Sequence, residues 1–304
     1  MSMDTAMRFT TPFTGGGVLP PELRPDDDEL DLFGLTHSGR VRAENQDHFL
    51  LCTVHPQVVV HGTSLPDPAA LALRGGRLAT VLLVADGVGG GAAGSLASRL
   101  ATEAVTRYLT TSLRRYHTAG TPAEGEFLAE LRAAALEAHE RVRAESAARQ
   151  EARDMATTLS VGVVVWPYIY VLQVGDSRCY FFEDGRLRQV TRDQTVAQDL
   201  VDRGILSRER AMASPLTHVL SSAIGAAEPE PVLTRVDGRY RGSVLLFCTD
   251  GLTKHVADAE IEAHLAAMES SEQACRALLD LALERGGSDN VTIVVARARR
   301  RPGR

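Results

Sequence analysis

The chain has 304 residues, enough for two ordinary domains or one large layered domain. Hydrophobic residues make up 44% and charged residues 24%, as in globular domains, which excludes a wholly disordered or collagen-like chain. The formal net charge of -6 argues against a nucleic-acid-binding protein, because proteins that bind polyanions usually carry a basic surface.

The cysteines and the apolar runs indicate the compartment. Four cysteines are scattered without a C-x-x-C spacing, which predicts neither a zinc knuckle nor a disulfide scaffold: Cys52, Cys179, Cys248 and Cys275. The longest apolar runs, at residues 81–85 and 161–166, are much shorter than the roughly 18 to 20 residues of a membrane span. The N-terminus lacks a basic segment followed by an apolar one. We therefore predict a cytoplasmic protein that makes no membrane contact.

The first half of the chain predicts an arm, two strands and two helices. Residues 1–30 are rich in Thr, Gly and Pro and lack apolar periodicity, which predicts a flexible N-terminal arm. Apolar stretches at 47–54 and 81–85 predict strands, and the patterns at 95–116 and 123–150 predict helices. In the second helix, apolar residues at three- and four-residue steps predict one buried stripe: Leu128, Leu131, Ala135, Ala138 and Val142.

The second half is rich in predicted strands, at residues 158–166, 169–174, 179–183, 186–190, 232–236, 243–248 and 290–296. Short turns, such as Asp184-Gly185, join the early ones, so these strands must be antiparallel. Helices are predicted near 258–267 and 271–285. Strands and helices in separate blocks predict an α+β layered fold. No linker divides it, so we expect one domain at 31–298 and a basic tail at 299–304.

Five aspartates follow or precede predicted apolar strands, each close to a Gly or Asn: Asp47, Asp86, Asp176, Asp250 and Asp289. An unpaired carboxylate in such a place costs roughly several kcal/mol to desolvate, so a compensating charge is expected. Carboxylates without His or Cys partners suit hard cations such as Mg²⁺ or Mn²⁺. A single Asp-Gly pair is more often a turn or a helix cap. Recurrence at five strand ends therefore favours a metal centre that acts on a phosphoryl group.

Six segments, in order, resemble those of the metal-dependent serine/threonine protein phosphatases of type 2C, in particular the short bacterial members. The first runs from Gly34 to Asp47 and is similar to the pattern G-x-x-R-x-x-N-E-D. The others are D-G-V-G-G from Asp86, A-T-T from Ala156, G-D-S-R from Gly175, D-G-L from Asp250 and D-N-V-T from Asp289. The resemblance extends from about residue 33 to residue 297, and six ordered segments are far more specific than one Asp-Gly pair.

This resemblance implies a four-layer α-β-β-α sandwich of two mainly antiparallel sheets flanked by helices. It implies that Asp86 bridges two Mn²⁺ or Mg²⁺ ions in a cleft, with the carbonyl of Gly87 as a further ligand. Asp250 and Asp289 would complete the coordination of one ion. Asp176 would form a third, weaker metal site together with Asp250.

The resemblance also implies an activity. Asp47 would hold metal-bound water, and Arg42 would bind the substrate phosphate with its fork of donors. The polar stretch at 193–231 matches a mobile flap that influences substrate choice. The implied reaction is hydrolysis of phosphoserine and phosphothreonine on proteins by a metal-activated water, in opposition to bacterial Ser/Thr kinases. We expect a monomer.

Three positions depart from the family pattern. Gln46 stands where the family usually has Glu, so we expect a lower metal affinity. This departure keeps an alternative open, a catalytically weak member that binds phosphoproteins as a regulatory module. Val88 stands where animal members have a histidine proposed as general acid, so proton donation to the leaving group would fall to metal-bound water. Ala156 replaces a Gly, which predicts a packing change only.

Other short motifs in the chain fit their usual functions less well. Residues 89–94 match G-x-G-x-x-G, but Asp86 would lie against a dinucleotide pyrophosphate and the following strands are predicted to be antiparallel. The segment from Gly175 lacks the second Gly of a G-x-S-x-G nucleophile elbow. His139 lacks the second histidine of H-E-x-x-H, and we interpret it as part of a solvated helix face. Arg178 is interpreted as a structural ion-pair partner.

Overall fold

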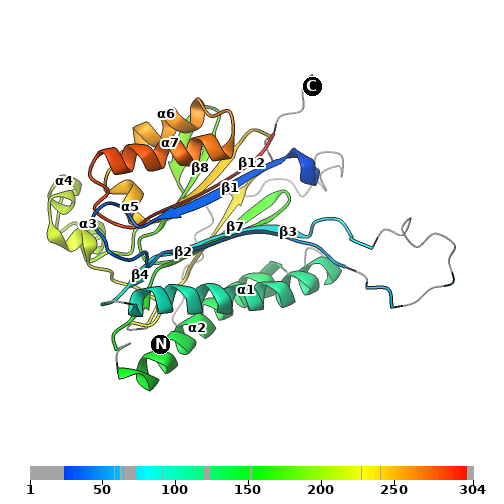
Figure 1. Cartoon of the computed structure of the whole chain (residues 1–304), viewed down its shortest axis with the longest axis horizontal. Coiled ribbons are helices and arrows are strands. Elements are labelled where there is room, and N and C mark those ends of the chain that lie inside the picture. Colours follow the sequence, from blue (N-terminus) through cyan, green and yellow to red (C-terminus); the bar gives the residue numbers. More distant parts are fainter. Residues whose placement is uncertain are drawn as a thin grey trace.

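The computed structural model describes residues 24–299, apart from residues 58, 62–63, 65–72, 91, 120–123, 151–152, 227 and 240. Two antiparallel sheets lie face to face at its centre, and helices cover the outer side of each (Figure 1). The layers therefore follow the order α-β-β-α, which confirms the fold class expected from the sequence.

Each sheet has five strands. The first has the order β1 (Leu30–His37), β12 (Val291–Ala298), β11 (Val244–Cys248), β8 (Arg178–Glu183) and β9 (Arg186–Gln189). The second has the order β10 (Val232–Asp237), β7 (Tyr168–Val174), β6 (Leu159–Val165), β3 (Ala79–Ala85) and β2 (His48–Val54). A short pair, β4 (Gly87–Val88) and β5 (Ala156–Thr157), lies beside it. All these pairings are antiparallel, so the G-x-G-x-x-G segment does not belong to a dinucleotide-binding βαβ unit.

The helices divide between the two outer layers. Helices α1 (Ala93–Ala119) and α2 (Glu124–Ala148) cover the second sheet, and α6 (Asp258–Ala266) and α7 (Ser271–Glu284) cover the first (Figure 1). The predicted flap contains α3 (Val196–Asp202), α4 (Arg208–Met212) and a 3-10 turn, Pro215–His218. These short helices lie at the same end of the sandwich as α5 (Asp250–Thr253).

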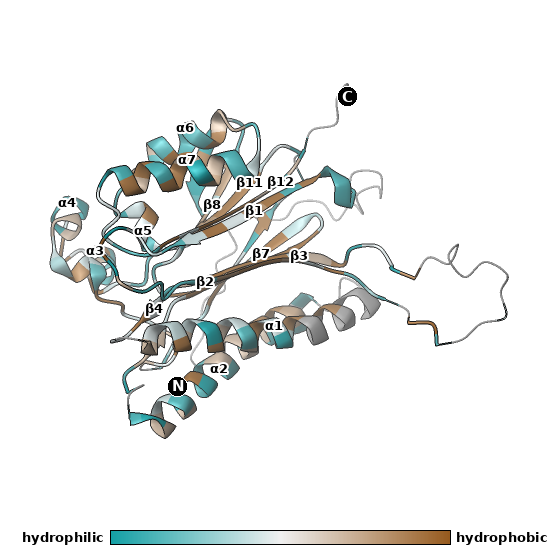
Figure 2. Ribbon diagram, in the orientation of Figure 1, coloured by the Kyte–Doolittle hydropathy of each residue, from teal (hydrophilic) through white to brown (hydrophobic). Residues whose placement is uncertain are grey.

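Burial on both faces explains why the central strands are continuously apolar. In β3, Val81 and Leu83 pack against the helices, whereas Leu82 and Val84 pack between the sheets. Figure 2 shows the resulting hydrophobic colour along the strands of both sheets. The predicted stripe of α2 is also buried in the helix-facing core, which confirms that periodicity: Leu128, Leu131, Ala135, Ala138 and Val142.

Strand β1 was not predicted from the sequence. Its apolar pattern is interrupted by Asp31 and by Gly34, so it lacks a long hydrophobic run. Gly34 is needed because the Phe49 ring of the facing sheet packs on it, and a Cβ there would lie 2.7 Å from that ring. The glycine therefore reflects close sheet-to-sheet packing.

The last part of the predicted arm, residues 24–29, contacts the sandwich. Within the predicted arm, Arg77 donates hydrogen bonds to Asp27 and to the Pro25 carbonyl, and Glu29 pairs with Arg241 at 2.9 Å. These contacts attach residues 24–29 to the sandwich. Residues 1–23 and 300–304, the rest of the predicted arm and tail, lie outside the described residues.

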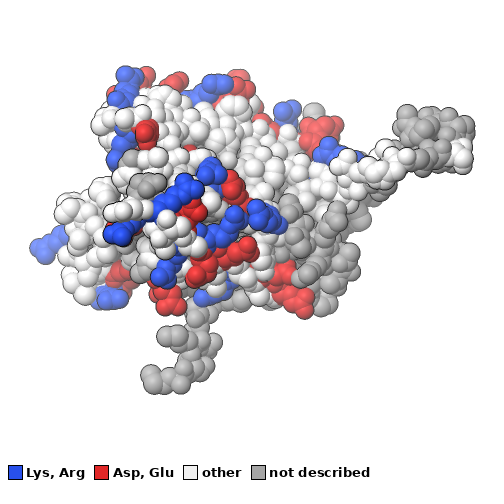
Figure 3. Space-filling model, turned by 60° about the horizontal axis from the view of Figure 1, so that its bottom comes forward, with Lys and Arg blue, Asp and Glu red and all other residues white. Residues whose placement is uncertain are grey.

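Three further features are the hydrophobicity of the helices, the state of the cysteines and the distribution of surface charge. Over the described part of the chain, no helix combines the length and hydrophobicity that crossing a membrane requires. All four cysteines are free. Figure 3 shows Lys and Arg interspersed with Asp and Glu on the face in view, with no broad area of one sign.

The interpretation of His139 as part of a solvated face is wrong. The side chain is only 4% exposed, and its Nδ1 accepts a hydrogen bond of 3.0 Å from the Gly225 backbone N–H. Because Nδ1 accepts this hydrogen bond, it carries no proton and the imidazole ring is neutral. Burial, aided by the positive charge of Arg143 and opposed by Glu140 and Glu228, lowers the pKa of His139.

We therefore predict that His139 makes stability depend on pH. Because its folded pKa lies below the ordinary value of 6.5, its contribution is complete above that pH and is lost as the pH falls through the folded pKa. His139→Asn, whose amide oxygen can accept the same bond, should lose less stability than wild type as the pH falls from above 6.5 through the folded pKa of His139. Urea unfolding measures this, with exposed His61→Asn as control. Equal pH slopes for His139→Asn and wild type would contradict the assignment.

Candidate metal centre

The strand pairings bring the five predicted aspartates to one end of the sandwich. The start of β2 pairs with the end of β3, which places Asp47 beside Asp86. The end of β11 pairs with the start of β12, which places Asp250 beside Asp289. Asp176 follows β7 at the same end. The negative charges of all four other carboxylates contribute to the raised pKa of Asp86. The structure therefore gathers every acid that the sequence singled out.

Asp47 connects the two sheets. Its Oδ2 accepts hydrogen bonds from the hydroxyls of Thr249, at 2.9 Å, and Thr292, at 2.7 Å, both on the opposite sheet. Its Oδ1 is buried and accepts no hydrogen bond. Burial, opposed by the two threonines and reinforced by Asp250 and Asp289, raises the pKa of Asp47 to about 7. One oxygen is thus fixed to the protein, and the other is left for a ligand.

Asp86 is held by its backbone. Its N–H donates to Thr158 Oγ1 at 2.9 Å, and its carbonyl accepts from Thr157 Oγ1 at 2.8 Å and from the Thr158 N–H. Thr158 Oγ1 also lies 2.7 Å from the hydroxyl of Ser177, beside Asp176. The A-T-T segment therefore fixes the turn that carries Asp86. Burial and then the four neighbouring carboxylates raise the pKa of Asp86 well above its ordinary value.

Gly87 is required by close backbone packing. A Cβ at this position would lie 2.2 Å from the Gly94 carbonyl oxygen and 2.6 Å from the Gln46 carbonyl oxygen. No other residue fits without moving the backbone, so the N-terminal end of α1 stays against the turn after Asp86.

Asp250 and Asp289 share Lys254 as a cationic partner, and Asp289 also pairs with Arg42. Lys254 Nζ lies 2.7 Å from Asp250 Oδ2 and 2.7 Å from Asp289 Oδ2. Arg42 Nε lies 2.8 Å from Asp289 Oδ1, and its Nη2 lies 3.0 Å from Oδ2. Although burial opposes the charged form, the Lys254 and Arg42 side chains lower the pKa of Asp289. Asp250 Oδ1 is buried and accepts no hydrogen bond.

The loop that carries Arg42 is fixed by Asn290. The Asn290 amide donates to the carbonyls of Ser38 and Glu44, and its oxygen accepts from the Gln46 N–H. The Arg42 side chain itself remains 57% exposed. A tethered backbone with an exposed guanidinium is suited to binding an anion beside Asp289.

The Gln46 side chain lies against the loop that follows Asp86. Its Nε2 donates to the Gly89 carbonyl at 3.3 Å. A glutamate here could not donate this bond, so the amide has a local structural role. The lower metal affinity expected from Gln46 stays a prediction.

Asp176 adjoins the predicted flap. Burial, followed by the charges of Asp250 and Asp193, raises the pKa of Asp176 to about 8, and Lys254 opposes this. Gln194 exchanges two hydrogen bonds with the Gly175 backbone and donates to the Glu230 carbonyl, so it ties both ends of the flap beside Asp176. Arg178 pairs with Asp193 at 2.7 Å, as predicted for a structural ion pair.

The residues present fit a divalent cation. The donor set is entirely oxygen, and two buried oxygens of the cluster, Asp47 Oδ1 and Asp250 Oδ1, have no protein partner. Among the described residues no three acidic, thiol or imidazole groups surround one point closely enough to hold an ion as they stand. Asp250 and Asp289 pair instead with Lys254 and Arg42. Metal binding would therefore involve side-chain adjustment.

Sequence reasoning missed several residues of the site. Thr249, Thr292, Asn290 and Gln194 act through hydrogen bonds to acids and loops far away in the chain, so no local pattern reveals them. Lys254 offered one signal, because it is the only lysine of the chain and follows Asp250 by one helical turn.

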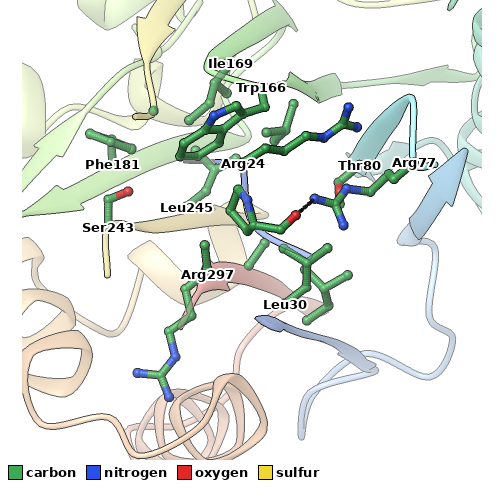
Figure 4. A pocket seen from close by; sticks show the side chains of 16 residues that line it. Arg24, Leu30, Arg77, Thr80, Trp166, Ile169, Phe181, Ser243, Leu245 and Arg297 are labelled. Atoms are coloured by element: carbon green, nitrogen blue, oxygen red, sulfur yellow. Dashed lines mark hydrogen bonds between the residues drawn. The ribbon is translucent and has the colours of Figure 1, made fainter. Parts of the chain in front are cut away.

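A different cavity lies at the other end of the sandwich. It is lined mainly by apolar side chains, among them Trp166, Ile169 and Leu245, with Arg24 and Arg77 at one side (Figure 4). Trp166 precedes β7, whereas Asp176 follows it, so the cavity and the acids are separated by the length of the strand. Its apolar lining offers nothing to activate water.

The comparisons with known proteins agree with the fold and the acids. Residues 61–284 match the family model described as Protein phosphatase 2C. The serine/threonine protein phosphatase PstP of Mycobacterium tuberculosis is 37% identical over 218 residues, which cover 72% of this chain and 40% of PstP. The serine/threonine phosphatase stp of Listeria welshimeri is 31% identical, over 71% of this chain and 83% of stp.

Solved structures show the same fold. A crystal structure of M. tuberculosis PstP superposes with a TM-score of 0.70 at 30% identity, covering 89% of this chain and 99% of that one. A second, of the PstP catalytic domain in complex with two manganese ions, gives a TM-score of 0.68 at 30% identity and the same coverage. The chain therefore belongs to the protein phosphatase 2C family, which its sequence resembles. The aligned part spans less than half of PstP.

We predict that the threonine pair stabilises the domain through Asp47. Thr292→Val keeps the shape of the side chain but leaves Asp47 Oδ2 with one hydroxyl instead of two, and it also removes the 2.8 Å contact with the Thr36 hydroxyl. The free energy of unfolding should fall by about 1.5 to 3 kcal/mol, the range for a hydrogen bond to a charged group. Urea unfolding tests this, and Thr292→Ser, which keeps the hydroxyl, should lose clearly less. Equal stability of the Val and Ser variants would show that this hydrogen bond contributes little.

Proposed function

We propose that this protein hydrolyses phosphoserine and phosphothreonine on proteins with the help of Mn²⁺ or Mg²⁺. The observation that carries the proposal is the convergence of five carboxylates, two of them with unpartnered buried oxygens, at one end of a protein phosphatase 2C fold. The ligands would be Asp86, the Gly87 carbonyl, Asp250 and Asp289, with two ions in the centre. When bound, the ions lower the pKa of water and polarise the phosphoryl group.

Arg42 supplies the anion-binding group. Its guanidinium is exposed and lies within 3.0 Å of Asp289, beside the expected ligands. A fork of N–H donors fits two oxygens of a phosphate, whereas a single charged donor does not. The tether from Asn290 to the loop limits the motion of the Arg42 backbone, so the phosphate is bound in one place.

Asp47 supplies a proton acceptor. Its Oδ2 is held by two hydroxyls, and its unpartnered Oδ1 is free to accept a proton or a hydrogen bond from the attacking water. With one oxygen fixed and the other open beside the expected ligands, this carboxylate is placed to accept a hydrogen bond or a proton from the attacking water. No Cys or His nucleophile is needed, and Val88 next to Gly87 is exposed and has no proton to donate.

The substrates would be phosphorylated proteins, and the opposing enzymes would be Ser/Thr kinases in the same cytoplasm. PstP and stp are named serine/threonine phosphatases, which supports this substrate class. The helices of the flap lie at the same end of the molecule as α5, which begins at Asp250 (Figure 1), and would contact the protein that carries the phosphate. The alternative is a weakly active member that binds phosphoproteins as a regulatory module. The feature of the sequence that favours this alternative is Gln46, which stands where the family usually has Glu.

A metal-dependent assay tests the proposal. Wild type should hydrolyse a phosphothreonine peptide with Mn²⁺ or Mg²⁺ and lose this activity in EDTA. Asp86→Asn, Asp250→Asn and Asp289→Asn should each lower kcat by more than about 100-fold, because each removes a charged ligand. In EDTA, Asp86→Asn should unfold at the same or a higher temperature, because it relieves repulsion among the acids.

The control is Asp280→Asn, which removes an exposed carboxylate on α7 outside the cluster and should retain the wild-type rate. Full activity of wild type in EDTA would contradict the proposal. Phosphopeptide binding without turnover at saturating Mn²⁺ would favour the regulatory module instead.

Arg42 should act mainly on substrate binding. Arg42→Ala should raise KM for the phosphopeptide by about 10-fold, the loss of roughly one strong charged hydrogen bond, with a smaller change in kcat. Arg42→Lys, which keeps the charge without the fork, should lie between wild type and Arg42→Ala. Arg40→Ala on the same loop serves as control, since the only hydrogen bond described for Arg40 is from its backbone. An unchanged KM would make Arg42 a surface partner of Asp289 only.

A further inference from the structure

The cavity at the end of the sandwich away from the acids combines apolar walls with arginine side chains (Figure 4). Its apolar walls come from both sheets, since Ile169 belongs to β7, Phe181 to β8 and Leu245 to β11. No Asp or Glu is among the lining residues that the structure describes. The basic residues that line it are three arginines: Arg24, Arg77 and Arg297. Any uncompensated charge at this cavity is therefore positive.

Two of the three arginines are already bound within the protein. The buried Arg77 side chain donates to the Asp27 carboxylate and to the Pro25 carbonyl. Arg297 pairs with Asp31 at 2.8 Å. These two arginines therefore hold the wall of the cavity in place and have little left to offer a ligand.

Arg24 is the arginine that remains available. Its carbonyl accepts a hydrogen bond of 3.4 Å from Arg241, whereas within the described residues its guanidinium forms no hydrogen bond or ion pair. Burial, followed by repulsion from Arg77, lowers the pKa of Arg24, and Asp27 opposes this only in part. An anion beside this guanidinium would stabilise its charged form, because it would supply the missing opposite charge.

Trp166 provides a second unsatisfied donor at the same cavity. Its indole Nε1 is buried and has no hydrogen-bond partner. A buried N–H without an acceptor is destabilising, and an oxygen of a ligand can accept from it. Trp166 is also the only tryptophan of the chain, so tryptophan fluorescence reports directly on this cavity.

We propose that this cavity binds a small apolar carboxylate, with its chain between the sheets and its oxygens bound by Arg24 and the Trp166 indole. A guanidinium matches the two oxygens of a carboxylate, and the indole N–H donates to one of them. A monoanion is favoured over a phosphate, because a second negative charge would stay unpaired in an apolar site. The site lies at the opposite end of β7 from Asp176, so it is independent of the metal centre and of the proposed function.

The probe for the test is sodium octanoate, added to the whole protein without metal. Octanoate should bind one-to-one and saturably, as measured by Trp166 fluorescence and by isothermal titration calorimetry, and should raise Tm. In the series butanoate, hexanoate and octanoate, the affinity should rise roughly 4-fold per methylene. 1-Octanol and octylammonium keep the chain without the negative charge and should bind at least about 10-fold more weakly.

Variants assign the two polar groups. Arg24→Gln should weaken octanoate binding by about 10-fold and leave the affinity for 1-octanol nearly unchanged. Trp166→Phe keeps an aromatic ring without the N–H and should also weaken octanoate binding, measured by calorimetry. The matched control is Arg74→Gln, which removes the same charge from an exposed residue that does not line the cavity, and it should bind octanoate as wild type does.

Each contrary outcome overturns the proposal. Wild type that shows no saturable octanoate binding has no such site. Equal affinity for octanoate and 1-octanol would show that the cavity takes apolar molecules without any use of its charge. Arg24→Gln that is folded by circular dichroism and binds octanoate like wild type would remove the anion site. An equal loss in Arg24→Gln and Arg74→Gln would show only a general attraction of anions to basic residues. None of these measurements depends on phosphatase activity.

Discussion

Repulsion among buried carboxylates is the constraint on which the rest of this structure depends. Asp47, Asp86 and Asp176 are each raised in pKa by burial and by neighbouring acids, so the cluster is costly without positive charge. Other side chains of the protein compensate part of this repulsion. Lys254 and Arg42 pair with Asp250 and Asp289, and hydroxyl donors stabilise Asp47. What remains unpaired is oxygen, which is the donor that hard divalent cations prefer.

Such a cluster requires a stiff frame. The two sheets are buried on both faces, and each acid is attached to the end of a strand whose neighbours are fixed in antiparallel register. Thr249 and Thr292 then connect the sheets through Asp47, so the separation of the sheets and the position of this carboxylate are coupled. Since repulsion would push the acids apart, the apolar core supplies the opposing force.

The sequence predicted the layers and the acids because both leave local patterns. Continuous apolar strands and the stripe of α2 identify burial, and a carboxylate at a strand end is conspicuous. Strand β1 was missed because Asp31 and Gly34 interrupt its pattern for reasons that only the partner elements reveal: Asp31 accepts from the Ser271 N–H, and Gly34 makes room for Phe49. His139 was misinterpreted because its burial depends on a loop 86 residues away.

The hydrogen bonds that support the site divide it into a fixed part and two tethered parts. Thr157 and Thr158 fix the Asp86 turn within the second sheet. By contrast, one side chain, Asn290, tethers the Arg42 loop, and another, Gln194, tethers the flap. Under the proposed function, changes in the loop or the flap would alter how a phosphoprotein is bound while the acids stay in register, whereas a change at the strand ends would alter the chemistry itself. The structure thus separates the groups placed to contact a substrate from the groups placed to hold the ions.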